Sequence, residues 1–182
     1  MTGHGGITGM ENALQNVTFA SKGSTAHGYL SLPELGSGPG GAVDYLLGHD
    51  AVTSSTIGAV GFCMGGGFVL VLAAQQGDKI GAAVPFYGVL GEQYPSFEHL
   101  SARVLGHFGD QDEMQSTDQV RELAATIERQ SGRKPDFRFY PAGHAFFYDQ
   151  NLLGTYDPDQ AAKAWDATVS FLRAQLTVPQ HG

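Results

Sequence analysis

The feature that most constrains this chain is the stretch 57–74, where a short apolar run passes through glycines into a second apolar run. Residues 57–67 read IGAVGFCMGGG, with Cys63 between Gly61 and Gly65. A β-branched run that ends at glycine predicts a strand, and the following apolar run has the length of a buried helix. The pattern Gly-x-Cys-x-Gly is the nucleophile elbow Gly-x-Ser-x-Gly with cysteine in place of serine. The sequence therefore predicts a sharp turn that exposes the Cys63 thiol.

This elbow would supply chemistry as well as geometry. We expect both flanking glycines to be needed, because the turn is strained and the helix must pass close to the strand. A helix N-terminus favours an anion at Cys63, and the Met64 N–H would point at an oxyanion formed on an attacked carbonyl. Two other interpretations stay open. Cys63 could be a buried structural cysteine, or the glycine-rich run could be a nucleotide-binding loop, although neither GxGxxG nor Gly-Lys-Ser/Thr is present.

Composition limits the function classes. The 182 residues predict a single domain, 1–182, with residues 1–12 as a flexible lead-in. A net charge of −8 argues against nucleic acid and against an anionic membrane as partners. The single cysteine excludes an internal disulfide and a multi-cysteine metal site. Without a membrane-length apolar run or a signal-peptide pattern, we expect a soluble, cytoplasmic protein.

Strand and helix patterns alternate along the chain, which predicts an α/β fold with a mostly parallel sheet covered by helices on both faces. An antiparallel hairpin at a sheet edge is expected first, from strands at 16–20 and 26–32. Further strands are expected at 57–61, 79–89, 103–109 and 136–140, and helices at 42–49, after the elbow, at 117–130 and at 159–176. Ser116 or Thr117 would cap the third helix, and the last helix offers Trp165, Val169, Phe171 and Leu172 as apolar anchors.

Three chemically active residues follow successive predicted strands. Cys63, then Asp112, then His144 come in the chain order nucleophile, acid, histidine of the α/β-hydrolase triad. In such an arrangement Asp112 orients His144, His144 takes the thiol proton, and Cys63 attacks an acyl carbon. Asp110 and Glu113 compete with Asp112 for the acid position. We expect the site at the carboxyl ends of the strands.

Several motifs together resemble the dienelactone hydrolase family of the α/β-hydrolase superfamily. They are GFCMGGG at 61–67, PFYG at 85–88, GDQD at 109–112, YPAGHAF at 140–146 and YLSLP at 29–33, so the resemblance spans nearly the whole chain. It implies a triad of Cys63, Asp112 and His144 and hydrolysis of a small-molecule ester or lactone through a thioester acyl-enzyme. It implies no metal and no organic cofactor. The expected enzyme class is the carboxymethylenebutenolidases and related esterases.

The chain also departs from this family. The fold expected is an abridged α/β-hydrolase, from which a βαβ-sized block is deleted near residues 36–42. In the family that block supplies the second oxyanion N–H, a glutamate that restrains the resting cysteine, and an arginine that binds the substrate carboxylate. A second arginine expected after His144 is replaced by AFFY at 145–148. An apolar or aromatic acyl ester then fits better, with Tyr87, Phe146 and Phe147 as pocket residues, although these aromatics could equally be core.

Two alternative functions and an assembly follow from the same residues. A weakened relative could act as a binding or assembly module, since losing one oxyanion donor costs a serine protease roughly 10²–10³ in rate. Cys63 could instead be a redox-sensing thiol, although no second cysteine is present to resolve it. Without the deleted block, strand 57–61 would lack a partner on one side. We therefore expect a homodimer that covers this edge.

Overall fold

The computed structural model describes residues 15–21, 24–30, 38–50, 52–90 and 94–176. The chain divides after Ala42 into two units, which are described separately below. The predicted lead-in at residues 1–12 lies outside the described residues. The single domain 1–182 and the deletion near 36–42 stay predictions.

The first unit contains two paired strands, β1 (Gln15–Ser21) and β2 (Ser24–Leu30). They run antiparallel, with Gln15 opposite Leu30 and Ser21 opposite Ser24, and they form a two-stranded sheet of their own. The hairpin was expected at the edge of the main sheet, but β1 and β2 do not belong to the sheet that contains β3 to β6.

Helix α1 (Gly38–Leu47) crosses the boundary between the units and differs from the predicted helix 42–49. It starts four residues earlier, which Pro39 permits because the N–H groups of a first helical turn have no intrahelical partner. It ends two residues earlier, where the Gly48 N–H donates to the Asp44 carbonyl at 2.9 Å. Residues 38–41, which lie outside the predicted helix 42–49, therefore form the first turn of α1.

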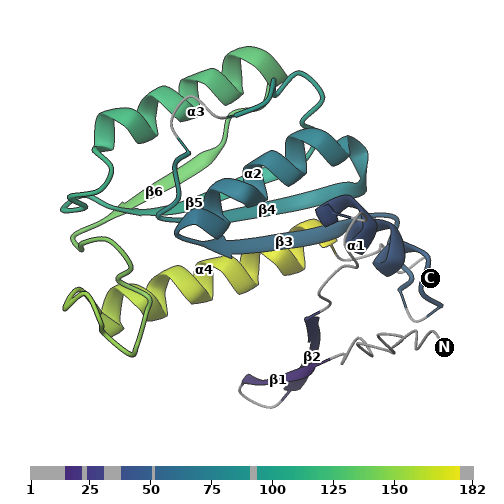
Figure 1. Cartoon of the computed structure of the whole chain (residues 1–182), viewed down its shortest axis with the longest axis horizontal. Helices are drawn as coiled ribbons and strands as arrows, with labels where there is room; N and C mark the ends of the chain where they lie inside the picture. The colour runs from purple at the N-terminus through teal and green to yellow at the C-terminus, as the bar shows by residue number, and fades with distance from the viewer. Residues whose placement is uncertain (1–14, 22–23, 31–37, 51, 91–93, 177–182) are drawn as a thin grey trace, which may run out of the picture. The chain divides into compact units, whose positions relative to one another are not determined.

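The second unit is built on a sheet of four parallel strands in the order β3-β4-β5-β6 (Figure 1). Its strands are β3 (Ile57–Phe62), β4 (Ile80–Phe86), β5 (Arg103–Gly109) and β6 (Asp136–Tyr140). Its helices are α2 (Met64–Gln76), α3 (Thr117–Ser131) and α4 (Pro158–Leu176), with a short 3₁₀ turn η1 (Gly77–Lys79) after α2. The chain therefore has an α/β fold with a parallel sheet flanked by helices.

Strand β4 is shorter than the predicted strand 79–89. It ends at Phe86 because Tyr87 has φ of 37°, which an extended strand does not allow. The Tyr87 N–H donates to the His107 carbonyl of β5 at 2.7 Å. The chain thus turns out of the sheet at the level where β3 also ends, since Phe62 pairs with Phe86.

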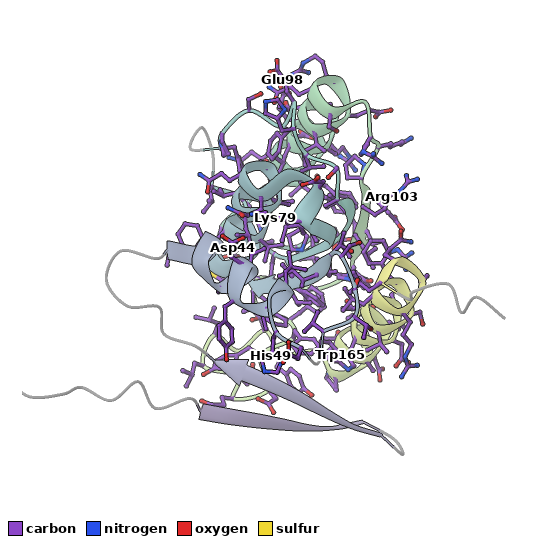
Figure 2. All side chains as sticks on the ribbon, turned by 90° about the vertical axis from the view of Figure 1, so that its right-hand side faces the viewer. Asp44, His49, Lys79, Glu98, Arg103 and Trp165 are labelled. Atoms are coloured by element: carbon purple, nitrogen blue, oxygen red, sulfur yellow. The ribbon has the colours of Figure 1, made fainter. Side chains whose placement is uncertain are left out.

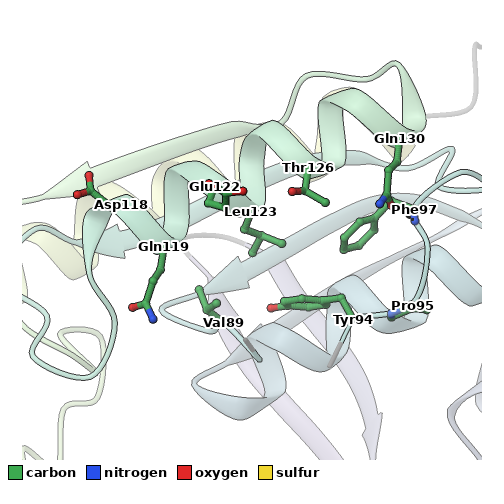
Figure 3. A pocket seen from close by; sticks show the side chains of 10 residues that line it. All are labelled: Val89, Tyr94, Pro95, Phe97, Asp118, Gln119, Glu122, Leu123, Thr126 and Gln130. Carbon is green, nitrogen blue, oxygen red and sulfur yellow. Dashed lines mark hydrogen bonds between the residues drawn. The ribbon is translucent and has the colours of Figure 1, made fainter. Parts of the chain in front are cut away.

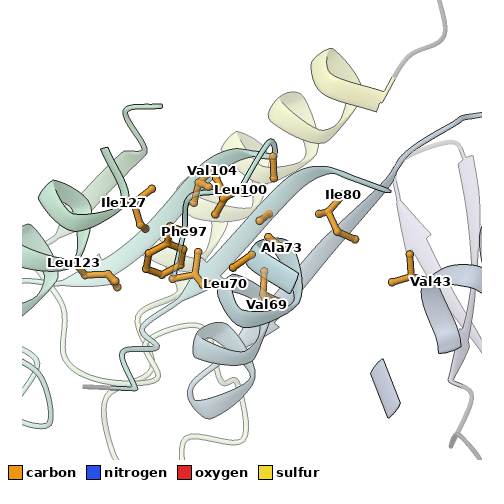
Figure 4. Close-up of a cluster of buried hydrophobic side chains, with 13 residues drawn as sticks. Val43, Val69, Leu70, Ala73, Ile80, Phe97, Leu100, Val104, Leu123 and Ile127 are labelled. Atoms are coloured by element: carbon orange, nitrogen blue, oxygen red, sulfur yellow. The ribbon is translucent and has the colours of Figure 1, made fainter. Parts of the chain in front are cut away.

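Helices α2 and α3 lie on one face of the sheet and α4 lies on the other (Figure 1). Each face has its own apolar core, as expected for parallel strands buried on both sides. The core under α2 and α3 contains Leu70, Phe97, Leu123 and Ile127, among other residues (Figure 4). The core under α4 contains Val84, Phe86, Tyr87, Tyr140, Ala142, Phe146 and Ala164.

Ser116, and not the alternative Thr117, is the N-cap residue of helix α3. The Ser116 side chain accepts the Gln119 N–H at 3.2 Å, and the Gln119 side chain accepts the Ser116 N–H at 2.8 Å. These two reciprocal bonds form a capping box. The helix then buries Val120, Leu123 and Ile127, which lie on one face at helical spacing.

Helix α4 buries a different face from the predicted one. Ala161, Ala164 and Thr168 are its buried residues, whereas Trp165 is 39% exposed (Figure 2). Trp165 is not among the residues that pack against the core under α4, and its ring lies 5.6 Å, centre to centre, from that of Phe147. The prediction of Trp165 as a core anchor is wrong, while Phe171 and Leu172 do pack against the core under α4.

Strand β3 lies at one edge of the four-stranded sheet, where it pairs with β4. Most of its residues are only half-buried, whereas nearly all residues of β4 are buried. Near this edge the exposed Lys79 ammonium contacts Asp44 at 2.7 Å (Figure 2). No helix among the described residues is both long and apolar enough to cross a membrane.

Candidate active site

Cys63 forms the sharp turn between β3 and α2. Its φ of 52° and ψ of −126° lie outside the usual regions for a side chain other than glycine. Its N–H donates to the Phe86 carbonyl at 3.0 Å, and its carbonyl accepts the Gly66 N–H at 2.9 Å. The residue is exposed. The structure therefore excludes the interpretation of Cys63 as a buried structural cysteine.

Close backbone contacts explain the glycines around this turn. A Cβ at Gly61 would lie 2.1 Å from the Gly65 carbonyl oxygen, and one at Gly88 would lie 2.2 Å from the Cys63 carbonyl oxygen. A Cβ at Gly66 would lie 2.7 Å from the Phe86 carbonyl oxygen. No atom lies within 4 Å of a Cβ built on Gly65. The expected need for glycine holds at Gly61, but the second crowded position is Gly66 rather than Gly65.

The structure brings the three predicted triad residues into contact. His144 Nε2 lies 3.2 Å from Cys63 Sγ, and His144 Nδ1 lies 2.8 Å from Asp112 Oδ2. An ionised Asp112 can only accept, so His144 donates its Nδ1–H to it and presents Nε2 to the thiol. Cys63 follows β3, Asp112 follows β5 and His144 follows β6, so the parallel sheet brings the three together.

Asp112 is held in place by its own loop. Its Oδ1 accepts the N–H groups of Met114 at 2.8 Å and of Gln115 at 3.2 Å. Its Oδ2 also accepts the Gln115 side-chain amide at 3.0 Å, and its side chain is fully buried. The competing acids Asp110 and Glu113 are exposed. Gln115 is a supporting residue that the sequence analysis missed.

The same contacts shift the ionisation of the site. The hydrogen bond to Asp112 raises the pKa of His144, burial opposes this, and the contact with Cys63 adds to the increase. Burial raises the pKa of Asp112, but hydrogen bonds from His144, Gln115 and Met114 outweigh it, so this pKa lies below its ordinary value. Burial, with the nearby Cys63 adding to it, raises the pKa of Tyr87. Asp112 is therefore suited to stabilise a protonated His144.

Met64, the predicted oxyanion donor, is the first residue of α2. The first N–H groups of a helix have no partner within it and carry the positive end of the helix dipole. The Met64 N–H therefore belongs to a group of donors directly beside Cys63. Its side chain is 62% exposed.

A cleft of about 720 Å³ opens at Cys63, within the size range of small-molecule sites. Tyr87 and Phe147, both predicted pocket residues, line it. Phe146 does not, because its ring is fully buried against Tyr87 and Tyr140, with ring centres 5.5 Å and 5.3 Å away. Phe146 is therefore a core residue.

Several cleft residues were not expected as such from the sequence. Phe62, Tyr148, Asp149, Tyr156 and Trp165 line the cleft together with alanines and a proline. The rings of Phe62, Phe147 and Trp165 follow one another, with centres 5.2 Å and 5.6 Å apart. Phe62 could have been found, since it is the residue before the elbow cysteine. Trp165 lies about one hundred residues further along, and only the fold brings it near.

A buried polar network lies beneath the site, and no sequence pattern indicated it. His107 of β5 is fully buried, with Nδ1 2.7 Å from the Tyr140 hydroxyl and Nε2 3.0 Å from the Thr168 hydroxyl. Thr168 donates to the Ala164 carbonyl, so its oxygen accepts from His107 Nε2–H, and Tyr140 donates to Nδ1. Burial, with the charge of Arg138 adding to it, lowers the pKa of His107 to about 4.

A separate cavity of about 550 Å³ lies between α3 and the residues Val89, Tyr94, Pro95 and Phe97 (Figure 3). Its described lining residues include Tyr94, Phe97, Glu122 and Leu123, but no cysteine or histidine. It therefore has none of the groups that act as nucleophile or base in the site around Cys63. Within the described part of the chain, no cluster of three histidine, cysteine or acidic residues could hold a metal ion.

Comparison with known proteins gives a consistent result. The family model of the dienelactone hydrolase family matches residues 37–176. Protein usf of Aquifex pyrophilus is 28% identical over 136 residues, which cover 75% of this chain and 58% of that protein. The carboxymethylenebutenolidase of Rhodococcus opacus is 29% identical over 152 residues, with coverages of 75% and 57%. The solved structure m3DLH superposes with a TM-score of 0.66 at 26% identity, over 75% of this chain and 59% of that one. The chain thus spans little more than half the length of the relatives it matches.

Proposed function

Because the chain belongs to the dienelactone hydrolase family of the α/β-hydrolase superfamily, we propose that it hydrolyses carboxylic esters or lactones with Cys63 as nucleophile. The observation that carries this proposal is the hydrogen-bonded chain from Cys63 through His144 to Asp112. A thiol and an imidazole in contact, with the imidazole oriented by a carboxylate, form an activated nucleophile.

In the first half of the reaction, Cys63 Sγ forms a bond to the carbonyl carbon while its proton passes to His144 Nε2. The carbonyl electron pair moves onto oxygen, where the Met64 N–H stabilises the negative charge. The tetrahedral intermediate then re-forms the carbonyl and breaks the bond to the alcohol oxygen. His144 returns its proton to that oxygen, and the product is a thioester on Cys63. Asp112 stabilises the imidazolium throughout.

Water completes the cycle. His144 accepts a proton from a water molecule that attacks the thioester carbonyl, and the thiolate leaves and takes this proton back. The products are the free acid, the alcohol and the restored enzyme. For a lactone, acid and alcohol remain in one molecule. Besides water and the Met64 N–H, the cycle uses the side chains of Cys63, His144 and Asp112.

The substrate class and the assembly form the finer part of the proposal. The aromatic cleft around Tyr87 and Phe147 suits an apolar or aromatic acyl group better than a carboxylate-bearing one. Two observations support an abridged fold that lacks an internal block near residues 36–42. The match covers only 58% of the length of protein usf, and β3 lies at the edge of the four-stranded sheet. On the same grounds we propose a homodimer.

The test uses p-nitrophenyl butyrate with wild-type protein, Cys63→Ser and His144→Ala. We expect both variants to lose activity by roughly 10²-fold or more. Stoichiometric alkylation of the single thiol should abolish activity as well. Leu152→Ala, at an exposed position outside the cleft lining, serves as the control. Retention of full activity after complete alkylation would exclude a cysteine mechanism.

A further inference from the structure

Among the described residues, the openings around Cys63 and His144 are lined by aspartate and glutamate but by no lysine or arginine. Among the described residues that line the cleft at Cys63, Asp149 is the only aspartate, glutamate, lysine, arginine or histidine. A neighbouring cavity of about 630 Å³ also reaches His144, and its described lining residues include Glu113 and Asp157 but no lysine or arginine. Tyr156 lines both spaces. A substrate that approaches Cys63 therefore meets negative charge.

No neighbour among the described residues neutralises the carboxylate of Asp149. Asp149 is exposed, and it has no ion pair with any described residue. Helix α4 faces the cleft with Pro158, Ala161, Ala162 and Trp165, which share one side at helical spacing. Lys163 is not among the residues that line the cleft. The negative charge at Asp149 is thus available to a bound molecule.

Exposed aromatic rings accompany this carboxylate. Phe62 is 38% exposed and Trp165 is 39% exposed, and the Phe147 ring lies between them. Tyr156 adds a further partly exposed ring to the same cleft. The face of an aromatic ring attracts a cation, most strongly for tryptophan, and does not favour an anion. Rings and a carboxylate in one cleft are the combination that recognises alkylammonium groups.

We propose that the cleft binds the part of the ester that carries an alkylammonium group, which Trp165, Phe147 and Asp149 receive while Cys63 attacks the carbonyl. This assignment of substrate class rests on the proposed esterase function. The cleft prefers a cationic ester over its neutral isostere, and it disfavours an ester with a free carboxylate. The net charge of −8 adds a long-range attraction for cations.

The kinetic test compares esters of matched shape. The acyl series consists of p-nitrophenyl γ-trimethylammoniobutyrate, the neutral analogue in which carbon replaces the ammonium nitrogen, and p-nitrophenyl hydrogen glutarate. The alcohol series consists of butyrylcholine and its neutral carbon isostere. Each kcat/KM is divided by the rate constant of the same ester with hydroxide, which removes intrinsic reactivity. We expect the cationic ester to be preferred in at least one of the two series.

Variants locate this preference. Asp149→Asn and Trp165→Leu should each reduce the ratio of cationic to neutral kcat/KM about two- to fivefold, the range of exposed cation–aromatic and ion-pair contacts. Asp159→Asn removes the same charge from α4 outside the cleft lining and should leave the ratio unchanged. Equal reduction by Asp149→Asn and Asp159→Asn would overturn the proposal, because the preference would then come from net charge alone.

A binding measurement separates this inference from the esterase function. Trp165 is the only tryptophan of the chain, so its fluorescence reports on the cleft. In Cys63→Ser protein, phenyltrimethylammonium should change this emission saturably, and more weakly after Asp149→Asn, whereas neutral tert-butylbenzene should bind less tightly. If this holds while no ester is hydrolysed, the cleft assignment stands and the esterase proposal fails. If hydrolysis occurs without cationic preference in either series, or the cation fails to bind in preference to the isostere, the assignment is wrong.

Discussion

Cys63, Tyr87 and Ala145 line the cleft and have positive φ, at 52°, 37° and 59°. Such conformations cost residues other than glycine about 1–3 kcal/mol each, and they persist where surrounding contacts fix them. Hydrogen bonds from the Cys63 N–H to Phe86 and from the Tyr87 N–H to His107 provide such contacts. Backbone strain is therefore concentrated next to the proposed nucleophile, as expected of a functional site.

At the same scale, Asp112→Asn tests how His144 is oriented. An amide can present its NH₂ group to Nδ1, which favours the tautomer that cannot accept the thiol proton. By comparison with serine triads, turnover should fall by roughly 10²–10⁴-fold. The hydrogen bond to Asp112 raises the pKa of His144, so its loss should also move the acidic limb of the kcat/KM profile to lower pH. The measurement is kcat/KM with p-nitrophenyl butyrate between roughly pH 5 and 9, an interval that covers the pH range in which histidine side chains usually titrate.

Asp110→Asn is the matched control, because Asp110 is exposed and lies two residues earlier in the same loop. It should change turnover and the pH profile little. An equal loss at Asp110 and Asp112, or a larger one at Asp110, would mean that the wrong carboxylate was identified.

At the scale of the elements, the His107 network connects β5 to β6 through Tyr140 and to α4 through Thr168. The Phe86 ring lies 4.5 Å from the imidazole, centre to centre, and Phe86 also accepts the Cys63 N–H. The network therefore supports the layer directly under the elbow. A fully satisfied buried network of this kind fixes how its elements pack.

This network should make the stability of the protein depend on pH. The pKa of His107 falls from 6.5 to about 4 on folding. Between these values the unfolded chain binds the proton and the folded chain does not, so the contribution of His107 is complete above pH 6.5 and is lost as pH falls toward 4. The shift corresponds to a free energy of about 3 kcal/mol. Urea unfolding of wild type at a series of pH values measures it.

His107→Gln provides the comparison. The variant should be less stable at neutral pH by about 1–3 kcal/mol, because partners of the imidazole lose hydrogen bonds. The difference from wild type should narrow as the pH falls toward 4. His99→Gln, at an exposed position, should keep the wild-type profile. If the free energy of unfolding changed with pH in the same way in wild type and His107→Gln, His107 would not be the group responsible for the pH dependence.

At the scale of the whole molecule, the edge at β3 is the feature that calls for a partner. The strand contains no lysine, no proline and no charged residue that would blunt its edge. Beside it, α2 exposes Phe68 by 53% and Met64 by 62%. An edge strand with no described partner on its outer side, next to exposed apolar side chains, is typical of an association site.

We expect the protein to be a homodimer at low micromolar concentration, with this edge and α2 in the interface. Light scattering on a sizing column should give twice the chain mass of 19.3 kDa. Phe68→Glu should shift the protein toward monomer, since it places a charge in the apolar surface. Leu152→Glu, at a position 76% exposed in the loop before α4, should not. A well-folded wild-type monomer would show that the chain covers its own edge.

The sequence by itself determined the local parts of this protein. An apolar β-branched run, a glycine, a thiol and a second apolar run specify strand, turn and helix from their neighbours alone, and the structure has β3, Cys63 and α2 there. The order Cys63, Asp112, His144 could be read in the same way, because successive parallel strands end at one edge of a sheet. The proposed triad could therefore be predicted from the sequence alone.

Only the tertiary structure decided what depends on direction and on distant neighbours. Asp112 differs from Asp110 in where its side chain points, and this follows from the N–H groups of Met114 and Gln115 that hold it. Trp165 lines the cleft, whereas the buried positions of α4 near it are occupied by the small residues Ala161, Ala164 and Thr168. His107 is the buried polar residue of a strand whose other buried residues are apolar, and its partners lie 33 and 61 residues away. Pairings over such distances leave no local pattern, because they are set by packing between elements rather than along the chain.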